Sequence, residues 1–195
     1  MKKLPISREQ ALELLKKWPQ AKSDFNHYFM SEAIMKKLAE KLGEDEDYWA
    51  MLGLLHDVDW ALTKNNWKEH CIKAAGILKT KGFDDTFIEN VQSHGYCYEK
   101  IPLLKGKKRN SKIQNSLTAA ENLTGIIYAY ALMRGKKISE MEAKGLKKKF
   151  NDKSFAANCN RELVKEIELT GLPLDGFFAL AIESIKKIKD QIGLN

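Results

Sequence analysis

The stretch MLGLLHDVDW, residues 51–60, combines an apolar helical run with the adjacent pair His56 and Asp57. In such apolar surroundings an ionised carboxylate is costly unless a cation lies beside it. Neighbouring residues on a helix project about 100° apart, so a helix end can offer two ligands to one ion. The stretch therefore predicts a helix that ends at a metal site, although a His–Asp pair alone is common.

Amphipathic helical patterns continue on both sides of this stretch. Ser7 and Gln10 form a capping-box pattern that predicts the start of a first helix. The apolar face of this helix is formed by Ala11, Leu14, Leu15 and Trp18. Further helices are expected at roughly 23–42, 45–57, 66–81, 84–95, 111–134, 139–150, 160–170 and 174–192.

Glycines mark the expected ends of three of these helices, at Gly43, Gly82 and Gly171. Alternating strand-like runs are essentially absent. We therefore expect an all-α bundle with short links that forms one domain over residues 1–195. Its metal-site core is expected at about 23–134, and its C-terminal helices at about 139–192.

The composition is that of a soluble globular protein, with 44% hydrophobic and 30% charged residues among 195. No apolar run is long enough to span a bilayer, and the start of the chain lacks the apolar stretch of a signal peptide. We therefore expect a cytoplasmic protein with no membrane partner. Cys71, Cys97 and Cys159 are odd in number and form no CxxC pair, which favours reduced, mostly buried thiols over disulfides.

Four histidines, at positions 27, 56, 70 and 94, share helical faces with apolar residues. His27 aligns with Ile34, for example, and the spacing of His70 aligns it with Ala74. A single inward-facing histidine is usually a core residue with a hydrogen-bond partner. Four buried imidazoles on separate helices are better explained by a shared metal ion, because neutral imidazole is a preferred metal ligand.

These residues resemble the pattern of the HD superfamily of metal-dependent phosphohydrolases, in which a lone His, an HD pair and a distant Asp follow one another. His27 in FNHYFMSEAIMKKLA and His56–Asp57 match the first parts. Members with two metals have two further histidines, which His70 in WKEHCIKAAGIL and His94 in VQSHGY match. The resemblance implies the HD-domain helical bundle, with one or two divalent ions of Fe, Mn, Ni, Co, Zn or Mg.

The chain is most similar to a group of uncharacterised bacterial HD-domain proteins predicted to be hydrolases. This similarity extends to LTAAENLTGIIYAYALM and KKKFNDKSFAANCNREL, at residues 117–133 and 147–163. Glu121 stands where the family has Asp, so the resemblance implies Glu121 as a metal ligand with a shifted oxygen. The residues after the HD pair, Val58 to Trp60, depart from the pattern of cyclic-dinucleotide phosphodiesterases and disfavour that substrate class.

The resemblance implies hydrolysis of a phosphate ester or anhydride, including that of a nucleotide. Asp57 would bridge two ions, and Asp59 would orient a ligand or accept a proton, although an exposed helix-end carboxylate is the plainer interpretation of Asp59. The net charge of +7 favours anionic partners, and we expect a small phosphorylated substrate rather than nucleic acid. The candidate phosphate donors are Lys73, Arg109 and Arg161.

Two other functions stay open from the sequence. Some HD-fold proteins with a similar ligand set use two iron ions to activate oxygen, and others bind nucleotides without turnover. The connection at residues 96–110, YCYEKIPLLKGKKRN, is either a lid or anion-binding loop, or a solvated basic surface loop. The oligomeric state is not encoded in any pattern of the chain.

Overall fold

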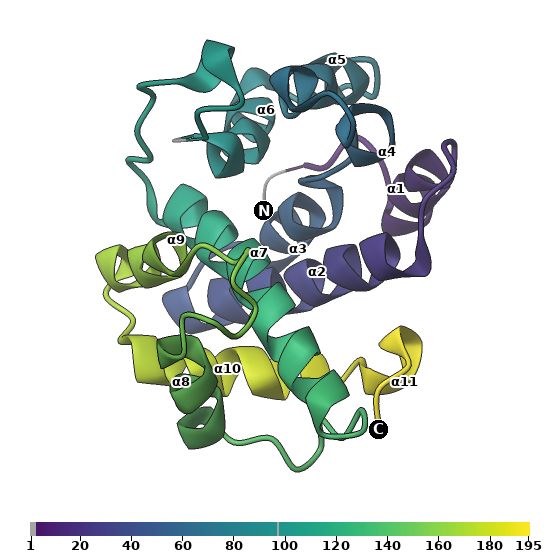
Figure 1. The fold of residues 1–195 in the computed structure, drawn as a ribbon. Helices are drawn as coiled ribbons and strands as arrows, with labels where there is room; N and C mark the ends of the chain where they lie inside the picture. The colour runs from purple at the N-terminus through teal and green to yellow at the C-terminus, as the bar shows by residue number, and fades with distance from the viewer. Residues whose placement is uncertain (1–2, 97) are drawn as a thin grey trace.

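The computed structural model describes residues 3–96 and 98–195, and its regular elements there are all helical (Figure 1). No strand occurs in this part of the chain, so the predicted all-α bundle is confirmed. In chain order the α-helices are α1 (Arg8–Leu15), α2 (Lys22–Leu42), α3 (Glu46–Leu55), α4 (Trp60–Thr63), α5 (Ile72–Lys79), α6 (Asp85–Gln92), α7 (Lys112–Met133), α8 (Ala143–Asn151), α9 (Arg161–Lys165), α10 (Leu174–Lys186) and α11 (Lys189–Ile192). Short 3-10 helices are η1 (Trp67–Glu69), η2 (Ser93–Gly95), η3 (Pro102–Leu104) and η4 (Glu166–Thr170).

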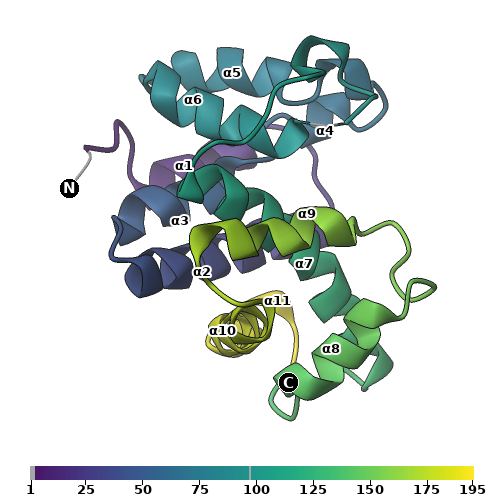
Figure 2. The same cartoon turned by 90° about the vertical axis from the view of Figure 1, so that its left-hand side faces the viewer.

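The helices form three layers, which are clearest in Figure 2. Helices α4, α5 and α6 make the upper layer, and α2, α3, α7 and α9 lie below it. Helices α8 and α10 cover the opposite side of this middle layer, where α10 packs on α2. The histidine-bearing segments therefore come together between the upper and middle layers.

Helices α2 and α3 make the most extensive helix–helix contact in the fold. Gly53 permits their close approach, since a Cβ atom at this position would lie only 2.5 Å from the carbonyl oxygen of Ser31. Ile34 and Leu38 of α2 are fully buried, as are Leu52 and Leu55 of α3. This packing fixes His27 on α2 relative to His56 at the end of α3.

Several helix boundaries confirm the predictions from local sequence. Ser7 Oγ accepts a hydrogen bond from the backbone N–H of Gln10, while the Gln10 side chain accepts one from the N–H of Ser7. Gly43 and Gly171 follow α2 and η4 with φ of 72° and 90°. Glycine adopts this left-handed backbone without a steric penalty, which ends each helix cleanly.

The predicted helix over residues 66–81 is wrong, because the chain breaks at His70 and Cys71. His70 has an extended backbone and Cys71 a left-handed one, with φ of 65°. The helical face assigned to His70 therefore does not exist, and the break turns its ring toward Asp59 instead. The predicted helix over 174–192 is likewise interrupted between α10 and α11, around Ile188.

The connection at residues 96–110 combines a small core with a charged outer side. Tyr96, Ile101 and Leu104 are buried with Cys71, while lysines 105, 107 and 108 are exposed. Cys97 lies outside the described residues. The predicted anion-binding role of this connection stays a prediction.

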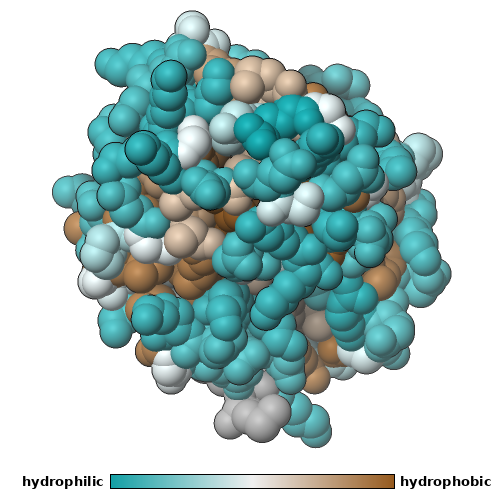
Figure 3. Space-filling view, turned by 90° about the horizontal axis from the view of Figure 1, so that it is seen from below, coloured by the Kyte–Doolittle hydropathy of each residue, from teal (hydrophilic) through white to brown (hydrophobic). Residues whose placement is uncertain are grey.

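The molecular face in Figure 3 is mostly hydrophilic, with apolar areas between hydrophilic side chains. None of the helices in the described parts of the chain is both long and apolar enough to cross a bilayer.

The contact at Gly53 gives a direct test of the fold. Gly53→Ala should lower the free energy of unfolding by about 1–3 kcal/mol, because the added methyl group meets the backbone of α2. Gly76→Ala is the matched control, because Gly76 is also helical but has open space around it. Its free energy of unfolding should rise by about 0.5–1 kcal/mol. Urea denaturation measures both, and equal effects would contradict the close helix contact.

Candidate metal centre

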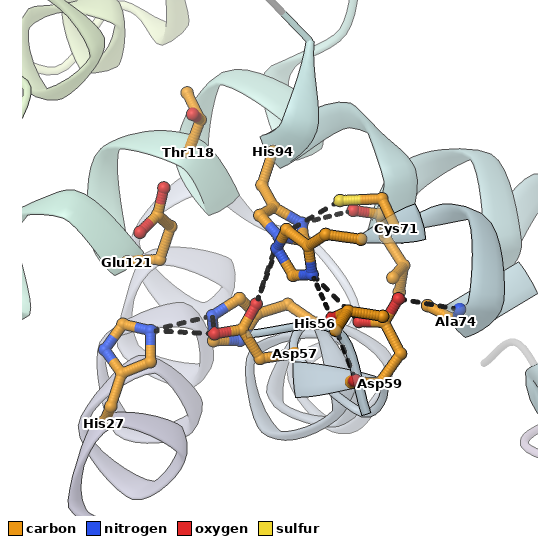
Figure 4. Close-up of polar contacts among 12 residues, drawn as sticks. His27, His56, Asp57, Asp59, Cys71, Ala74, His94, Thr118 and Glu121 are labelled. Atoms are coloured by element: carbon orange, nitrogen blue, oxygen red, sulfur yellow. Dashed lines mark hydrogen bonds and ion pairs between the residues drawn. The ribbon is translucent and has the colours of Figure 1, made fainter. Parts of the chain in front are cut away.

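All four histidines converge on Asp57 from different segments (Figure 4). His27 comes from α2, and His56 caps the C-terminal end of α3, directly before Asp57. His70 follows η1, and His94 lies within η2. Each of the last three therefore sits at a helix end or in a short 3-10 turn.

The carboxylate of Asp57 divides its two oxygens between two pairs of histidines. Its Oδ2 lies 3.7 Å from His27 Nε2 and 3.5 Å from His56 Nε2. Its Oδ1 lies 3.4 Å from His70 Nε2 and 3.2 Å from His94 Nε2. Asp57 thus lies between two neighbouring groups of ligand atoms, as expected for a bridging carboxylate.

The Nδ1 atom of every ring has an acceptor, which fixes the tautomer. His56 and His94 donate from Nδ1 to the carbonyl oxygens of Gly53 and Val91, at 2.8 and 2.6 Å. His70 donates from Nδ1 to Asp59 Oδ1 at 3.0 Å.

His27 Nδ1 lies 2.8 Å from Thr124 Oγ1, and this hydroxyl gives its own proton to the Glu121 carbonyl oxygen. His27 must therefore be the donor. In all four neutral rings Nε2 then carries a lone pair that faces Asp57.

These Nε2 atoms are too close to one another to stay without a shared positive partner. His27 Nε2 and His56 Nε2 are 2.9 Å apart, and His70 Nε2 and His94 Nε2 are 3.2 Å apart. Ligand atoms about 2.0–2.2 Å from a tetrahedral zinc ion lie about 3.3–3.5 Å from each other. Around Asp57, the separations of 3.4 and 3.5 Å fall in this range, and those of 3.2 and 3.7 Å lie within about 0.2 Å of it. The His27–His56 pair would need to open by roughly 0.4 Å.

The proton affinities of the first pair favour neutral imidazole. Burial lowers the pKa of His56 to about 3, even though the Asp57 carboxylate acts in the opposite direction. Burial lowers the pKa of His27 in the same way. Both rings therefore present lone pairs to a metal at neutral pH without first losing a proton.

The raised pKa values of the second pair, His70 and His94, show that positive charge is stabilised beside Asp57. Burial acts to lower the pKa of His70, but the hydrogen bond to Asp59 and the Asp57 charge raise it to about 10. The pKa of His94 is also raised, against the effect of burial. Burial would raise the pKa of Asp57, yet the surrounding histidines hold it well below its usual range. In the metal-free protein protons supply the positive charge that an ion supplies when bound.

Asp59 is fully buried, so the interpretation of this residue as an exposed helix-end carboxylate is wrong. Its Oδ1 accepts the Nδ1 proton of His70, and its Oδ2 accepts the backbone N–H of Ala74 at 3.0 Å. These two bonds hold the His70 ring in one orientation. A carboxylate behind a histidine in this way typically orients a metal ligand and increases its basicity.

Glu121 of α7 lies beside the cluster, and no hydrogen bond or ion pair joins it to His27, His56 or His94 in Figure 4. It belongs to neither group of ligand atoms in the described residues, and its Oε1 accepts a hydrogen bond from Asn122 Nδ2. Burial raises the pKa of Glu121 to about 8, and Asp57 adds to this. Thr118 lies one turn earlier, and its buried hydroxyl has no hydrogen-bond partner among the described residues. The role of Glu121 as a ligand stays a prediction.

Cys71 is the residue of this cluster that sequence reasoning missed. Its Sγ lies 3.5 Å from His94 Nε2, and the donor atoms of His70, Cys71 and His94 all lie within 4.8 Å of one another. Cys71 is buried and Cys159 half-buried, and no disulfide joins these two cysteines. Only the direct neighbourhood of His70 and Cys71 in WKEHC hinted at the grouping.

The three predicted phosphate donors lie in different surroundings. Lys73 is half exposed and forms an ion pair with Glu69 at 2.7 Å. Arg109 forms a bidentate pair with Glu166 and donates to the carbonyl oxygens of Ser93 and Tyr96.

Arg161 donates only to backbone carbonyl oxygens in the turn that links α8 to α9. These belong to Phe150, Asp152, Phe155, Ala156 and Cys159. These contacts favour a structural role for both arginines, and their role in substrate binding stays a prediction.

Comparison with known proteins agrees with this geometry. Residues 24–122 match the HD domain, and this range includes all four histidines as well as Asp57, Asp59 and Glu121. No solved structure matches the chain. The matched range covers about half of the chain and all of the elements that position the cluster. The chain belongs to the HD domain family.

Proposed function

We propose that this protein is a metal-dependent phosphohydrolase that acts on a phosphate ester or anhydride. The observation that carries the proposal is the position of Asp57, whose two oxygens face two separate pairs of histidine lone pairs. The proposed first ion lies among His27, His56 and Asp57, and the second among His70, His94 and Asp57. When bound, divalent ions activate a water molecule and bear the negative charge of phosphoryl oxygens.

The protein's own side chains prepare this chemistry by orientation. Asp59 and the carbonyl oxygens of Gly53 and Val91 hold three rings with Nε2 facing inward. These three rings already face inward before a ligand arrives, and such preorganisation is the main source of electrostatic catalysis. Thr118 offers a free buried hydroxyl on the α7 side of the cluster, suited to hydrogen-bond a water molecule or a phosphoryl oxygen.

The open side of the cluster indicates where a substrate would approach. The side chains of His27 and Asp57 are 26% and 13% exposed, whereas those of His56, His70 and His94 are nearly fully buried. A phosphate group would therefore reach the centre at His27 and Asp57. The more enclosed second pair would hold its ion away from solvent.

Aromatic side chains support a substrate with a flat ring, such as a nucleotide. The Trp60 and Trp67 rings lie 5.4 and 5.7 Å from the His70 ring, and Tyr98 lies 6.2 Å from Trp67. Lys100 Nζ lies 5.0 Å from the centre of the Trp67 ring. Half-buried indole rings beside a mobile cation suit a base and its phosphate.

The proposal is tested by metal content and substrate panels together. The protein, purified anaerobically without chelator, should contain a divalent transition metal by elemental analysis. With Mn²⁺ or Mg²⁺ and without oxygen, it should release phosphate from a panel of nucleotides and phosphomonoesters. Turnover that requires oxygen and changes the redox state of bound iron would instead support the oxygenase function. Tight nucleotide binding without turnover in any metal would select a regulatory role.

The bridging role of Asp57 gives the first prediction. Asp57→Asn preserves the shape of the side chain but removes the negative charge, so most of the metal and all detectable hydrolysis should be lost. Asp47→Asn is the control, because Asp47 is an exposed carboxylate on the preceding helix. Full metal content in Asp57→Asn would show that the ligand assignment is wrong.

The orienting role of Asp59 gives a prediction for one ion alone. Both of its oxygens accept hydrogen bonds, so Asp59→Asn must place an N–H group against another donor. The affinity for the second ion should fall about tenfold to a hundredfold, while the first ion is retained. Stepwise metal titration followed by elemental analysis measures this. An equal loss of both ions would contradict the separate roles of the two pairs.

Glu121 gives a prediction about pH. In the metal-free protein the pKa of Glu121 is raised to about 8, so the stabilisation from its protonated form is lost as pH rises through this value. Glu121→Gln cannot ionise, so its stability advantage over the parent should grow between about pH 5 and about pH 9. The measurement is urea denaturation at both pH values.

Repeating the Glu121 experiment with metal decides whether the residue is a ligand. A bound cation in contact with the carboxylate would lower its pKa and remove the pH-dependent advantage of Glu121→Gln. If the advantage persists with metal, Glu121 is no ligand. Glu168→Gln, at an exposed position, serves as the control and should show no pH-dependent difference.

A further inference from the structure

The thiol of Cys71 lies in the same buried space as the second pair of histidines. Its Sγ is 3.5 Å from His94 Nε2, and His94 Nε2 is in turn 3.2 Å from His70 Nε2. His94 has already committed its Nδ1 proton to the Val91 carbonyl. When His94 is neutral, the lone pair of its Nε2 therefore faces the sulfur and the His70 ring together.

The distance between Cys71 Sγ and His94 Nε2 fits a common tetrahedral ion. With metal–sulfur and metal–nitrogen bonds of about 2.3 and 2.0–2.1 Å, sulfur and nitrogen ligands lie about 3.5 Å apart. The Sγ–Nε2 separation of 3.5 Å equals this value. Asp57 Oδ1 completes a set of four, at 3.2 Å from His94 Nε2 and 3.4 Å from His70 Nε2.

The strained backbone of Cys71 is a second indication that the fold requires the thiol at this position. Cys71 adopts φ of 65°, a left-handed conformation that residues with a Cβ atom rarely occupy. The left-handed turn separates η1 from α5 and brings Cys71 and His70 to one side. Such strained residues cluster at sites where the fold requires a specific side-chain position.

The neighbouring backbone is also shaped around the sulfur. A Cβ atom at Gly95 would lie 2.6 Å from Cys71 Sγ, so only glycine leaves room for the thiol beside His94. The Cys71 carbonyl oxygen accepts a hydrogen bond from Gln92 Nε2 at 3.2 Å. Residues on both sides of His94 therefore fix the position of the cysteine.

We infer that Cys71 is a thiolate ligand of the second metal position, together with His70, His94 and Asp57 Oδ1. The inference rests on the proposed metal centre. On binding, the S–H proton and the Nε2 protons that His70 and His94 carry in the metal-free protein pass to solvent, and the sulfur and both nitrogens bond the ion through their lone pairs. A thiolate in the ligand set favours Zn²⁺, Fe²⁺ or Co²⁺ over Mg²⁺, so the two positions differ in the metals they select.

The test uses Co²⁺, because a thiolate bonded to Co²⁺ gives a charge-transfer absorption band in the near ultraviolet that histidine and carboxylate do not give. The full-length protein carrying Cys97→Ala and Cys159→Ala leaves Cys71 as its sole thiol. This background should bind Co²⁺ at both positions and show the band. Adding Cys71→Ser should abolish the band and lower the affinity for the second Co²⁺ ion by more than about tenfold.

Cys71→Gly in the same background separates a ligand from a structural residue. Glycine relieves the left-handed backbone, so the metal-free variant should be at least as stable as its parent in urea denaturation. It should nevertheless lose the second ion. Retention of both Co²⁺ ions by Cys71→Gly, or full Co²⁺ loading of the background without the band, would overturn the inference.

The outcomes also distinguish this inference from the proposed metal centre. If two ions bind without a thiolate band, the metal centre stands and the cysteine ligand fails. If no ion binds to the background or to the unaltered protein, the proposed metal centre fails and the inference fails with it. If Cys71→Ser loses the band and the second ion while the first stays, both are supported.

Discussion

The mutual repulsion of lone pairs around Asp57 is the constraint on which the rest of the structure depends. Four imidazole nitrogens face one carboxylate in a buried space, at separations as short as 2.9 Å. Each ring has its Nδ1 proton engaged elsewhere, so no proton is left between the neutral rings. Low-dielectric surroundings make such an arrangement costly without a cation, and protons or metal ions must supply that charge.

Three interruptions in the helical framework position the side chains of this cluster. The α3 helix ends just before His56, whose Nδ1 then donates to a carbonyl oxygen of the last turn. His94 lies in a 3-10 turn, and the break at His70 and Cys71 separates η1 from α5. In a continuous α-helix, the carbonyl oxygens that accept the Nδ1 protons of His56 and His94 would instead accept backbone N–H groups. The side chains would also point in other directions. The packed helical layers stabilise the fold, whereas the irregular turns position the side chains of the cluster.

The charged residues outside the cluster divide into two kinds. Arg109 and Arg161 bind backbone carbonyl oxygens and thereby fix the connections around the bundle. Both guanidinium groups would lose these hydrogen bonds if they moved to bind a substrate. The surface lysines form the second kind: Lys73 pairs with Glu69, and Lys100 lies beside the Trp67 ring, which packs against the His70 ring. The positive charge of the chain therefore does not translate directly into phosphate-binding groups.

The sequence by itself determined the helical class, most helix positions, the capping box at Ser7 and the inward placement of His27, His56 and His94. These follow from periodicity and from backbone preferences that act within a few residues. Only the tertiary structure decided how Asp57 divides its oxygens, that Asp59 is buried behind His70, and that Cys71 joins the cluster. It also decided that the helix expected over residues 66–81 breaks at His70. These features depend on contacts between residues far apart in the chain, such as His27 with His56, whose geometry is set by packing between layers and not by local periodicity.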